Sequence, residues 1–139
     1  MYENENKNNA PAAGQDKLEV IFGLQKALDT DIAERRGLEF TPEQWIQKDV
    51  LAMVSELAEL LDEVNFKWWK NPKPIDSESL QGELVDILHF FISMCIRAGM
   101  DADKLYNGYI AKNKENFDRQ YGHSAKKGYD VNEVDSSEV

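Results

Sequence analysis

The chain has 139 residues, which fits one domain of ordinary size. Its 26 acidic residues outnumber its 16 Lys and Arg residues, so the formal net charge is −10. Such a chain gains no counterion release on DNA and is repelled by anionic membranes, which argues against nucleic-acid and membrane partners. The single cysteine, Cys95, excludes an intrachain disulfide and a cysteine-rich zinc ribbon. The sequence has neither an apolar N-terminal leader nor ~18 consecutive apolar residues, so we expect a cytoplasmic protein.

Four segments have the periodicity of amphipathic helices, and none shows the alternation of a strand. The first predicted helix covers about residues 16–36. The second begins sharply, because Thr41 suits the N-cap, Pro42 suits the first helical position and Gln44 completes a capping box. Its apolar stripe predicts that it continues towards Trp68.

The third predicted helix runs from about 77 to 98 and stops at Gly99, a typical C-cap glycine. It is apolar on almost every face from 84 to 96, so we expect it to be buried. The fourth runs from about 101 to 120. Four helices with short loops predict an all-α, four-helix bundle-like fold.

The ends of the chain differ in composition from the middle. Residues 1–15 are polar and rich in Asn, and are expected to form a flexible arm. Residues 16–120 are expected to form the folded domain. Residues 121–139 are expected to be a partly mobile segment that could close over a site.

Two pairs of acidic residues with i, i+3 spacing lie on the second and third predicted helices: Glu56 with Glu59, and Glu83 with Asp86. A lone Glu-x-x-Glu pair is usually a solvated helix face. The third helix changes this interpretation, because a buried carboxylate costs several kcal/mol unless a cationic side chain or a metal ion accompanies it. If the two faces meet, a divalent cation would relieve the mutual repulsion. Oxygen ligands without cysteine favour Mg²⁺, with Mn²⁺ possible, and Mg²⁺ also takes phosphate oxygens.

A second group of polar residues lies near the end of the fourth helix. Lys112, Asn116 and Arg119 recur at i, i+4 and i+7 and so share one helix face. An ammonium, an amide and a guanidinium suit a polyphosphate, although cations are also common at solvated helix C-termini. Together with the acids they would form two sides of one metal–phosphate site.

The acid pattern resembles the signature of the all-α nucleoside triphosphate pyrophosphohydrolases, which include the MazG-like enzymes and the dimeric dUTPases. Further blocks resemble the dimeric dUTPases over about residues 18–129. These blocks are Leu24-Gln25-x-x-Leu28-Asp29, Phe66-Lys67-Trp68-Trp69-Lys70-Asn71, Val85-Asp86-Ile87-Leu88-His89-Phe90, Lys112-Asn113-x-x-Asn116-x-x-Arg119-Gln120 and Gly128-Tyr129. At position 29 this chain has Asp where we expect an amide side chain.

The resemblance implies Mg²⁺-dependent hydrolysis of dUTP to dUMP and pyrophosphate by a metal-activated water, in a homodimer or a dimer of dimers. It implies that the metal ligands are Glu56, Glu59, Glu83 and Asp86, with Glu56 as the residue that activates the water. The residues it places around the substrate are Gln25, Asp29, Trp69, Lys70, His89, Phe90, Lys112, Asn116, Arg119 and Tyr129. One alternative is a MazG-like hydrolase of another nucleotide, such as dCTP or a modified nucleotide. The other is a non-catalytic helical interaction module.

Overall fold

The computed structural model describes residues 14–133, and every regular element in that range is an α-helix. The elements are α1 (Lys17–Arg36), α2 (Pro42–Glu63), α3 (Ser77–Arg97) and α4 (Ala102–Gln120). The predicted all-α fold with four helices is confirmed. Most of the expected N-terminal arm and the last six residues of the expected C-terminal segment lie outside the described residues.

The helices begin where side chains satisfy the free backbone N–H groups. The Asp16 carboxylate accepts a hydrogen bond from the backbone N–H of Glu19 at 3.0 Å and caps α1. At the start of α2, the Gln44 N–H donates to Thr41 Oγ1 at 3.2 Å, and the Thr41 N–H donates to Gln44 Oε1 at 3.0 Å. This is the capping box that the sequence predicted. Gly99 follows α3 with φ +80°, a conformation that favours glycine.

α2 ends earlier than the sequence predicted. Its apolar stripe indicated a helix towards Trp68, but the helix ends at Glu63 and Asn65 adopts a left-handed conformation with φ 58°. The Asn65 side chain then closes the loop, because its Nδ2 donates to the carbonyl of Lys73 and its Oδ1 accepts from the Lys73 N–H, both at 2.8 Å. Asn tolerates this backbone conformation better than most residues, so the helix stops here.

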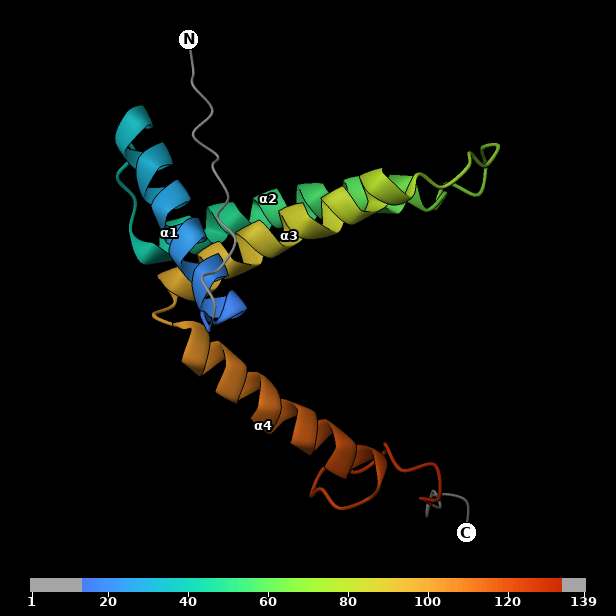
Figure 1. The fold of residues 1–139 in the computed structure, drawn as a ribbon. Helices are drawn as coiled ribbons and strands as arrows, with labels where there is room; N and C mark the ends of the chain where they lie inside the picture. The colour runs from blue at the N-terminus through green and yellow to red at the C-terminus, as the bar shows by residue number, and fades with distance from the viewer. Residues whose placement is uncertain (1–13, 134–139) are drawn as a thin grey trace. The chain divides into compact units, whose positions relative to one another are not determined.

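The chain divides into two compact units, residues 1–102 and 103–139, which we describe separately. In the first unit, α2 and α3 pack side by side and α1 packs on α3 (Figure 1). The buried apolar side chains described in this unit are Phe22, Ile92, Cys95 and Ala102. The second unit contains nearly all of α4 and a segment of turns that follows it.

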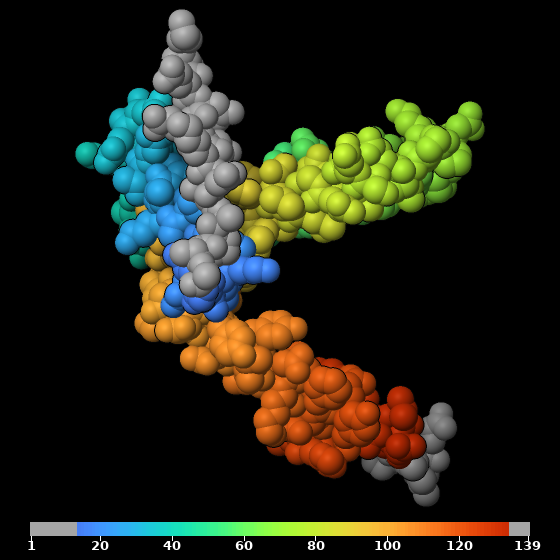
Figure 2. Space-filling model, in the orientation of Figure 1, coloured from blue at the N-terminus to red at the C-terminus, as the bar shows by residue number. Residues whose placement is uncertain are grey.

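Within the first unit, the expectation that the third helix is buried is wrong. Leu84 and Val85 on α3 are each 51% exposed, and several apolar side chains of α2 are comparably open. In Figure 2 the surface of the α2–α3 pair is drawn in green to yellow. A helix that is apolar on every face needs neighbours on every face, and α1 and α2 cover only part of this one.

Among the described residues, α3 is also the one helix long and apolar enough to cross a membrane, with a mean hydropathy of 1.3. Core helices of soluble proteins share this property, so it is weak evidence by itself. The helix carries Glu83 and Asp86 near its middle, and a carboxylate there would cost about 3 kcal/mol inside a bilayer. These acids therefore disfavour a membrane-spanning role.

Candidate metal centre

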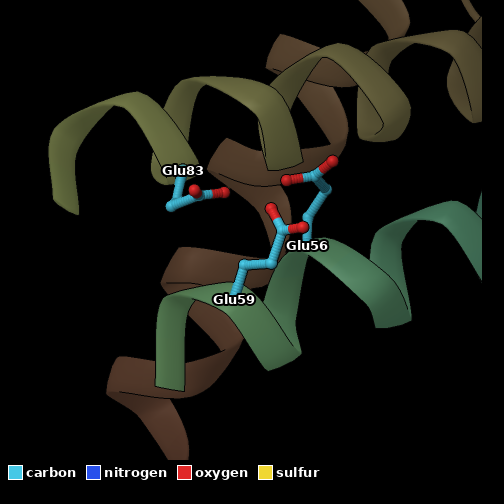
Figure 3. A group of neighbouring side chains, drawn as sticks. All are labelled: Glu56, Glu59 and Glu83. Atoms are coloured by element: carbon cyan, nitrogen blue, oxygen red, sulfur yellow. The ribbon is translucent and has the colours of Figure 1, made fainter. Parts of the chain in front are cut away.

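Three carboxylates meet between α2 and α3. Glu56 and Glu59 lie one turn apart on α2, so both side chains can point to the same side of that helix. Glu83 points back towards them from α3 (Figure 3). One carboxylate oxygen from each residue lies within 4.8 Å of the other two. The side-by-side packing of the two helices is what brings these acids, distant in the sequence, into one group, which we call the acid group.

The acid group has oxygens without partners. Glu56 Oε2 and Glu83 Oε2 are shielded from solvent and have no hydrogen-bond partner among the described residues. The pKa of Glu83 is raised to about 7, first by a hydrogen bond with Glu56, then by partial desolvation and by the negative charges of Glu59 and Glu56. Two carboxyl groups can share a hydrogen bond only when one of them is protonated. At neutral pH the group therefore needs either a proton or a cation.

The residues of the acid group fit a small divalent cation. All the donors are carboxylate oxygens, which are the ligands that Mg²⁺ and Mn²⁺ prefer. The unpartnered oxygens of Glu56 and Glu83 are available for such a bond. Asp86, the fourth predicted ligand, lies one turn after Glu83 on α3 but is exposed and is not part of the group. Its role as a ligand stays a prediction.

Two predicted substrate residues, Gln25 and Asp29, lie together on α1. Gln25 is buried, and its Nε2 donates to Asp29 Oδ1 at 2.9 Å. The second oxygen of Asp29 accepts a hydrogen bond from Ser93 of α3 at 2.7 Å. Phe90, one turn before Ser93, is half-buried. The structure thus ties the predicted base-binding residues of α1 to the C-terminal part of α3.

The remaining predicted residue of α3, His89, is exposed on the helix surface. Its Nδ1 donates to the backbone carbonyl of Val85 at 2.9 Å. This bond orients the ring and leaves Nε2 as the nitrogen able to meet a ligand.

The loop after α2 holds the next two predicted residues, Trp69 and Lys70. The Trp69 ring packs edge-to-face on Trp68, with centroids 4.7 Å apart, and on Phe66, with centroids 5.9 Å apart. Trp69 is still 57% exposed, so its face is available to a ligand or a partner. Lys70 and Asn71 line a cavity of ≈ 210 Å³ in the same loop.

The predicted phosphate-binding residues belong to the second unit. On α4, Arg119 donates to Glu115 Oε1 at 3.1 Å and to Asn116 Oδ1 at 3.3 Å, and its guanidinium lies 5.6 Å from the centre of the Tyr129 ring. Lys112 is exposed on the same helix. The structure therefore groups Arg119, Asn116 and Tyr129. The convergence of these residues with the acid group stays a prediction, because the two sets lie in different units.

Sequence reasoning missed a buried polar set in the first unit. Asp49 of α2 is 8% exposed and Ser93 of α3 is 3% exposed, and Arg97 lies one turn beyond Ser93. A signal was present in the sequence, since Asp49 precedes Val50 of the apolar stripe and Ser93 interrupts the apolar run of the third helix. Interpreting this signal required knowing which faces of α2 and α3 meet in the folded chain.

The fold and the site together define a class of protein, namely an all-α chain that carries a cluster of carboxylates between two paired helices. The sequence model of the dUTPase family matches residues 17–104, a range that contains α1, α2, α3 and the acid group. The chain belongs to the dUTPase family. The α4 residues Lys112, Asn116 and Arg119 lie beyond the matched range.

Two similar proteins are both called dCTP pyrophosphatase. The protein of Enterobacteria phage T4 is 45% identical over 47 residues, which are 34% of this chain and 28% of that protein. The protein of Enterobacteria phage LZ5 is 32% identical over 74 residues, which are 53% of this chain and 43% of that protein. The chain therefore spans less than half the length of these two relatives. No solved structure matches the chain.

Proposed function

We propose that the chain is a nucleoside triphosphate pyrophosphohydrolase that uses Mg²⁺ to hydrolyse dUTP to dUMP and pyrophosphate. The observation that carries the proposal is the acid group, where three carboxylates from two helices leave shielded oxygens of Glu56 and Glu83 without partners. Membership of the dUTPase family supports the substrate class.

In the proposed reaction, water adds to the triphosphate, the bridge between the α and β phosphate groups breaks, and pyrophosphate leaves. A divalent cation held by Glu56, Glu59 and Glu83 would neutralise phosphate charge and make water a usable nucleophile near neutral pH. In this proposal Glu56 accepts the proton of the attacking water with the carboxylate oxygen that does not bind the cation. No protein nucleophile is needed.

The substrate is held by residues from several elements. Gln25 and Asp29 contact the edge of the base, and Phe90 contacts its face or the deoxyribose. Lys112, Asn116 and Arg119 contact the phosphates and the sugar. The remaining proposed contacts come from the loop after α2, from α3 and from the C-terminal segment: Trp69, Lys70, His89 and Tyr129.

A second candidate substrate is dCTP, which two observations favour. The relatives from phages T4 and LZ5 are named dCTP pyrophosphatase. Asp29 also offers only acceptor oxygens when ionised, and cytosine presents an exocyclic amino group as a donor where uracil presents an oxygen. An acceptor at this place suits cytosine better than an amide does.

We further propose that the chain works as a homodimer or a dimer of dimers. Apolar side chains along α2 and α3 stand open in the single chain, including Leu57, Leu61, Leu84, Val85 and Leu88. A second copy of the same helix pair would cover this apolar face with apolar side chains of its own.

The test is pyrophosphate release by the full chain from dUTP, dCTP, dTTP and UTP, each with Mg²⁺, with Mn²⁺ and with EDTA. The expected result is Mg²⁺-dependent release that is fastest with dUTP. Turnover of dCTP at least as fast as dUTP would select the second candidate. Modified nucleotides are assayed in the same way. If no nucleotide releases pyrophosphate, the chain is instead a non-catalytic helical module.

A further inference from the structure

A polar side chain in the apolar run of α3 reaches across to another helix. Ser93 is 3% exposed, and its Oγ donates a hydrogen bond to Asp29 Oδ2 of α1 at 2.7 Å. A serine inside a helix commonly donates to the carbonyl of the residue four positions earlier. The hydroxyl has one hydrogen, and Ser93 uses it to join α3 to α1 instead. This bond therefore belongs to the packing of the helices and not to α3 itself.

Both oxygens of the Asp29 carboxylate accept hydrogen bonds. Oδ1 accepts from Nε2 of Gln25 at 2.9 Å, and Oδ2 accepts from Ser93. The O–H···O distance of 2.7 Å is typical of a bond to a charged carboxylate, which is about twice as strong as a bond between neutral groups. With a donor on each oxygen, the carboxylate cannot turn about its Cβ–Cγ bond without breaking one of the two bonds.

Two cationic side chains lie on the other side of this carboxylate's choice of partners. Lys26 and Arg97 line a cavity of ≈ 220 Å³ between α1 and α3, together with Asp29. Arg97 Nε is shielded from solvent and has no hydrogen-bond partner among the described residues. Within that part of the chain, Asp29 forms an ion pair with neither cation. Because a carboxylate binds a guanidinium more strongly than an amide, an Asp29 without its bond to Ser93 is expected to turn towards Arg97.

The bond to Asp29 fixes the orientation of the Gln25 amide. Gln25 is 8% exposed, and its Nε2 donates to Asp29. The opposite orientation of the amide would place Oε1 against a carboxylate oxygen, and two acceptors repel each other. Oε1 therefore faces away from Asp29, where it can only accept a hydrogen bond.

We propose that Ser93 is a positioning residue for base recognition: it holds Asp29, and Asp29 holds the Gln25 amide with Oε1 as a fixed acceptor for an N–H of the pyrimidine edge. Uracil has a ring N–H donor beside a carbonyl acceptor, whereas cytosine has a ring nitrogen acceptor beside an amino donor. A fixed acceptor matches only one of these bases at a given place, but an amide that can turn over matches both. This inference rests on the proposed function, in which Gln25 contacts the base.

The first experiment observes the Gln25 amide and needs no activity. The hydrogens of its side-chain NH₂ are followed by ¹H–¹⁵N NMR in the full chain, for wild type, Ser93→Ala and the matched control Ser77→Ala, at an exposed serine at the start of α3. The hydrogen donated to Asp29 should exchange with water about 5-fold faster in Ser93→Ala than in wild type, the effect of one lost hydrogen bond. Ser77→Ala should show wild-type exchange.

Backbone exchange in α1, measured in the same spectra, separates this effect from a general loss of stability. Equal exchange of the Gln25 amide in Ser93→Ala and wild type would overturn the link between Ser93 and Gln25. If Ser93→Ala does not fold, Ser93→Cys takes its place, because a thiol has nearly the size of the hydroxyl and is a weaker donor.

The second experiment measures kcat and KM for dUTP and dCTP. In Ser93→Ala the ratio of kcat/KM between the preferred and the other nucleotide should fall by about 5-fold, through KM and with little change in kcat, because the acid group is untouched. Ser93→Thr retains the hydroxyl and should keep the wild-type ratio. A purely structural role of Ser93 would affect both nucleotides equally. An unchanged ratio in Ser93→Ala, or a wild type that does not distinguish the two nucleotides, would refute the positioning role.

Gln25→Met tests whether the effect passes through the amide, because Met has nearly the length of Gln without its polar group. Adding Ser93→Ala to Gln25→Met should not change the nucleotide ratio further. A further change would mean that Ser93 acts on recognition by another route and would contradict the proposal. An inactive wild-type chain would refute the proposed function, and the exchange of the Gln25 amide would still decide whether Ser93 positions it.

Discussion

Glu56 of α2 and Glu83 of α3 place carboxylate oxygens within 4.8 Å of each other, and each also has a shielded oxygen without a hydrogen-bond partner. The contact raises the pKa of Glu83 to about 7. A protein with no use for these acids would be more stable with neutral side chains in their place. The same contact therefore weakens the fold without a cation and supports the proposed activity with one.

Glu83→Gln tests the acid group directly. We expect hydrolysis to fall by more than about 100-fold, because the proposed cation loses a ligand, while the helical content is preserved. Without metal the variant should have a higher Tm than wild type, because mutual repulsion is removed. Circular dichroism and the pyrophosphate assay measure both effects. Glu43→Gln, in the first turn of α2 and outside the acid group, is the matched control. Full activity in Glu83→Gln would contradict the proposed site.

Asp86→Asn tests the predicted ligand that the structure leaves outside the acid group. If Asp86 joins the site when the cation and nucleotide bind, hydrolysis should be lost as in Glu83→Gln. The Tm without metal should change little, because the exposed Asp86 carboxylate is not in the repelling group. Wild-type activity in Asp86→Asn would restrict the ligand set to the three acids that meet in the structure.

The raised pKa of Glu83 predicts how stability depends on pH without metal. Between its ordinary value of 4.5 and about 7, the folded chain binds more protons at this site than the unfolded chain. The stabilisation is fully present below pH 4.5 and is lost as the pH rises through about 7. The Tm of wild type in EDTA should therefore fall from pH 5 to pH 8 by more than that of Glu83→Gln. Equal pH profiles for the two proteins would exclude a protonated Glu83.

The open apolar face predicts self-association. At micromolar concentration, sedimentation equilibrium should give a dimer or a tetramer of the 15.9 kDa chain. Leu84→Glu places a charge on the half-exposed face of α3 and should shift the chain towards monomer. Val131→Glu, at a side chain that is 91% exposed in the second unit, should leave the assembly unchanged. A wild-type chain that sediments only as a monomer would rule out the proposed assembly.

We expect substrate preference to depend on the side chain at position 29. A site that hydrogen-bonds one pyrimidine edge can reject the other by as much as ~10⁴-fold, because buried polar groups lose their partners. We expect kcat/KM to be higher for dUTP than for dCTP, dTTP and UTP, and Asp29→Asn to raise the preference for dUTP over dCTP. If wild type prefers dCTP, the second candidate is correct. If Asp29→Asn leaves the ratio unchanged, Asp29 does not influence base recognition.

Much of the secondary structure could be predicted from the sequence because its causes are local. The capping box of Thr41 and Gln44 and the stop at Gly99 depend on side chains within a few residues of the helix ends. The candidate acids could be predicted too, since i, i+3 spacing places Glu56 and Glu59 on one face of any helix. The family resemblance over the first three helices is confirmed by the match to residues 17–104.

Other features depended on contacts between residues that are distant in the sequence. The end of α2 at Glu63 is stabilised by the bonds between Asn65 and Lys73, which a stripe of apolar residues cannot reveal. The packing of α3 on α1 makes Ser93 a hydrogen-bond partner of Asp29 rather than an ordinary serine in an apolar run. Helix periodicity determines which side chains share a face, but only the packing of the helices decides which faces meet.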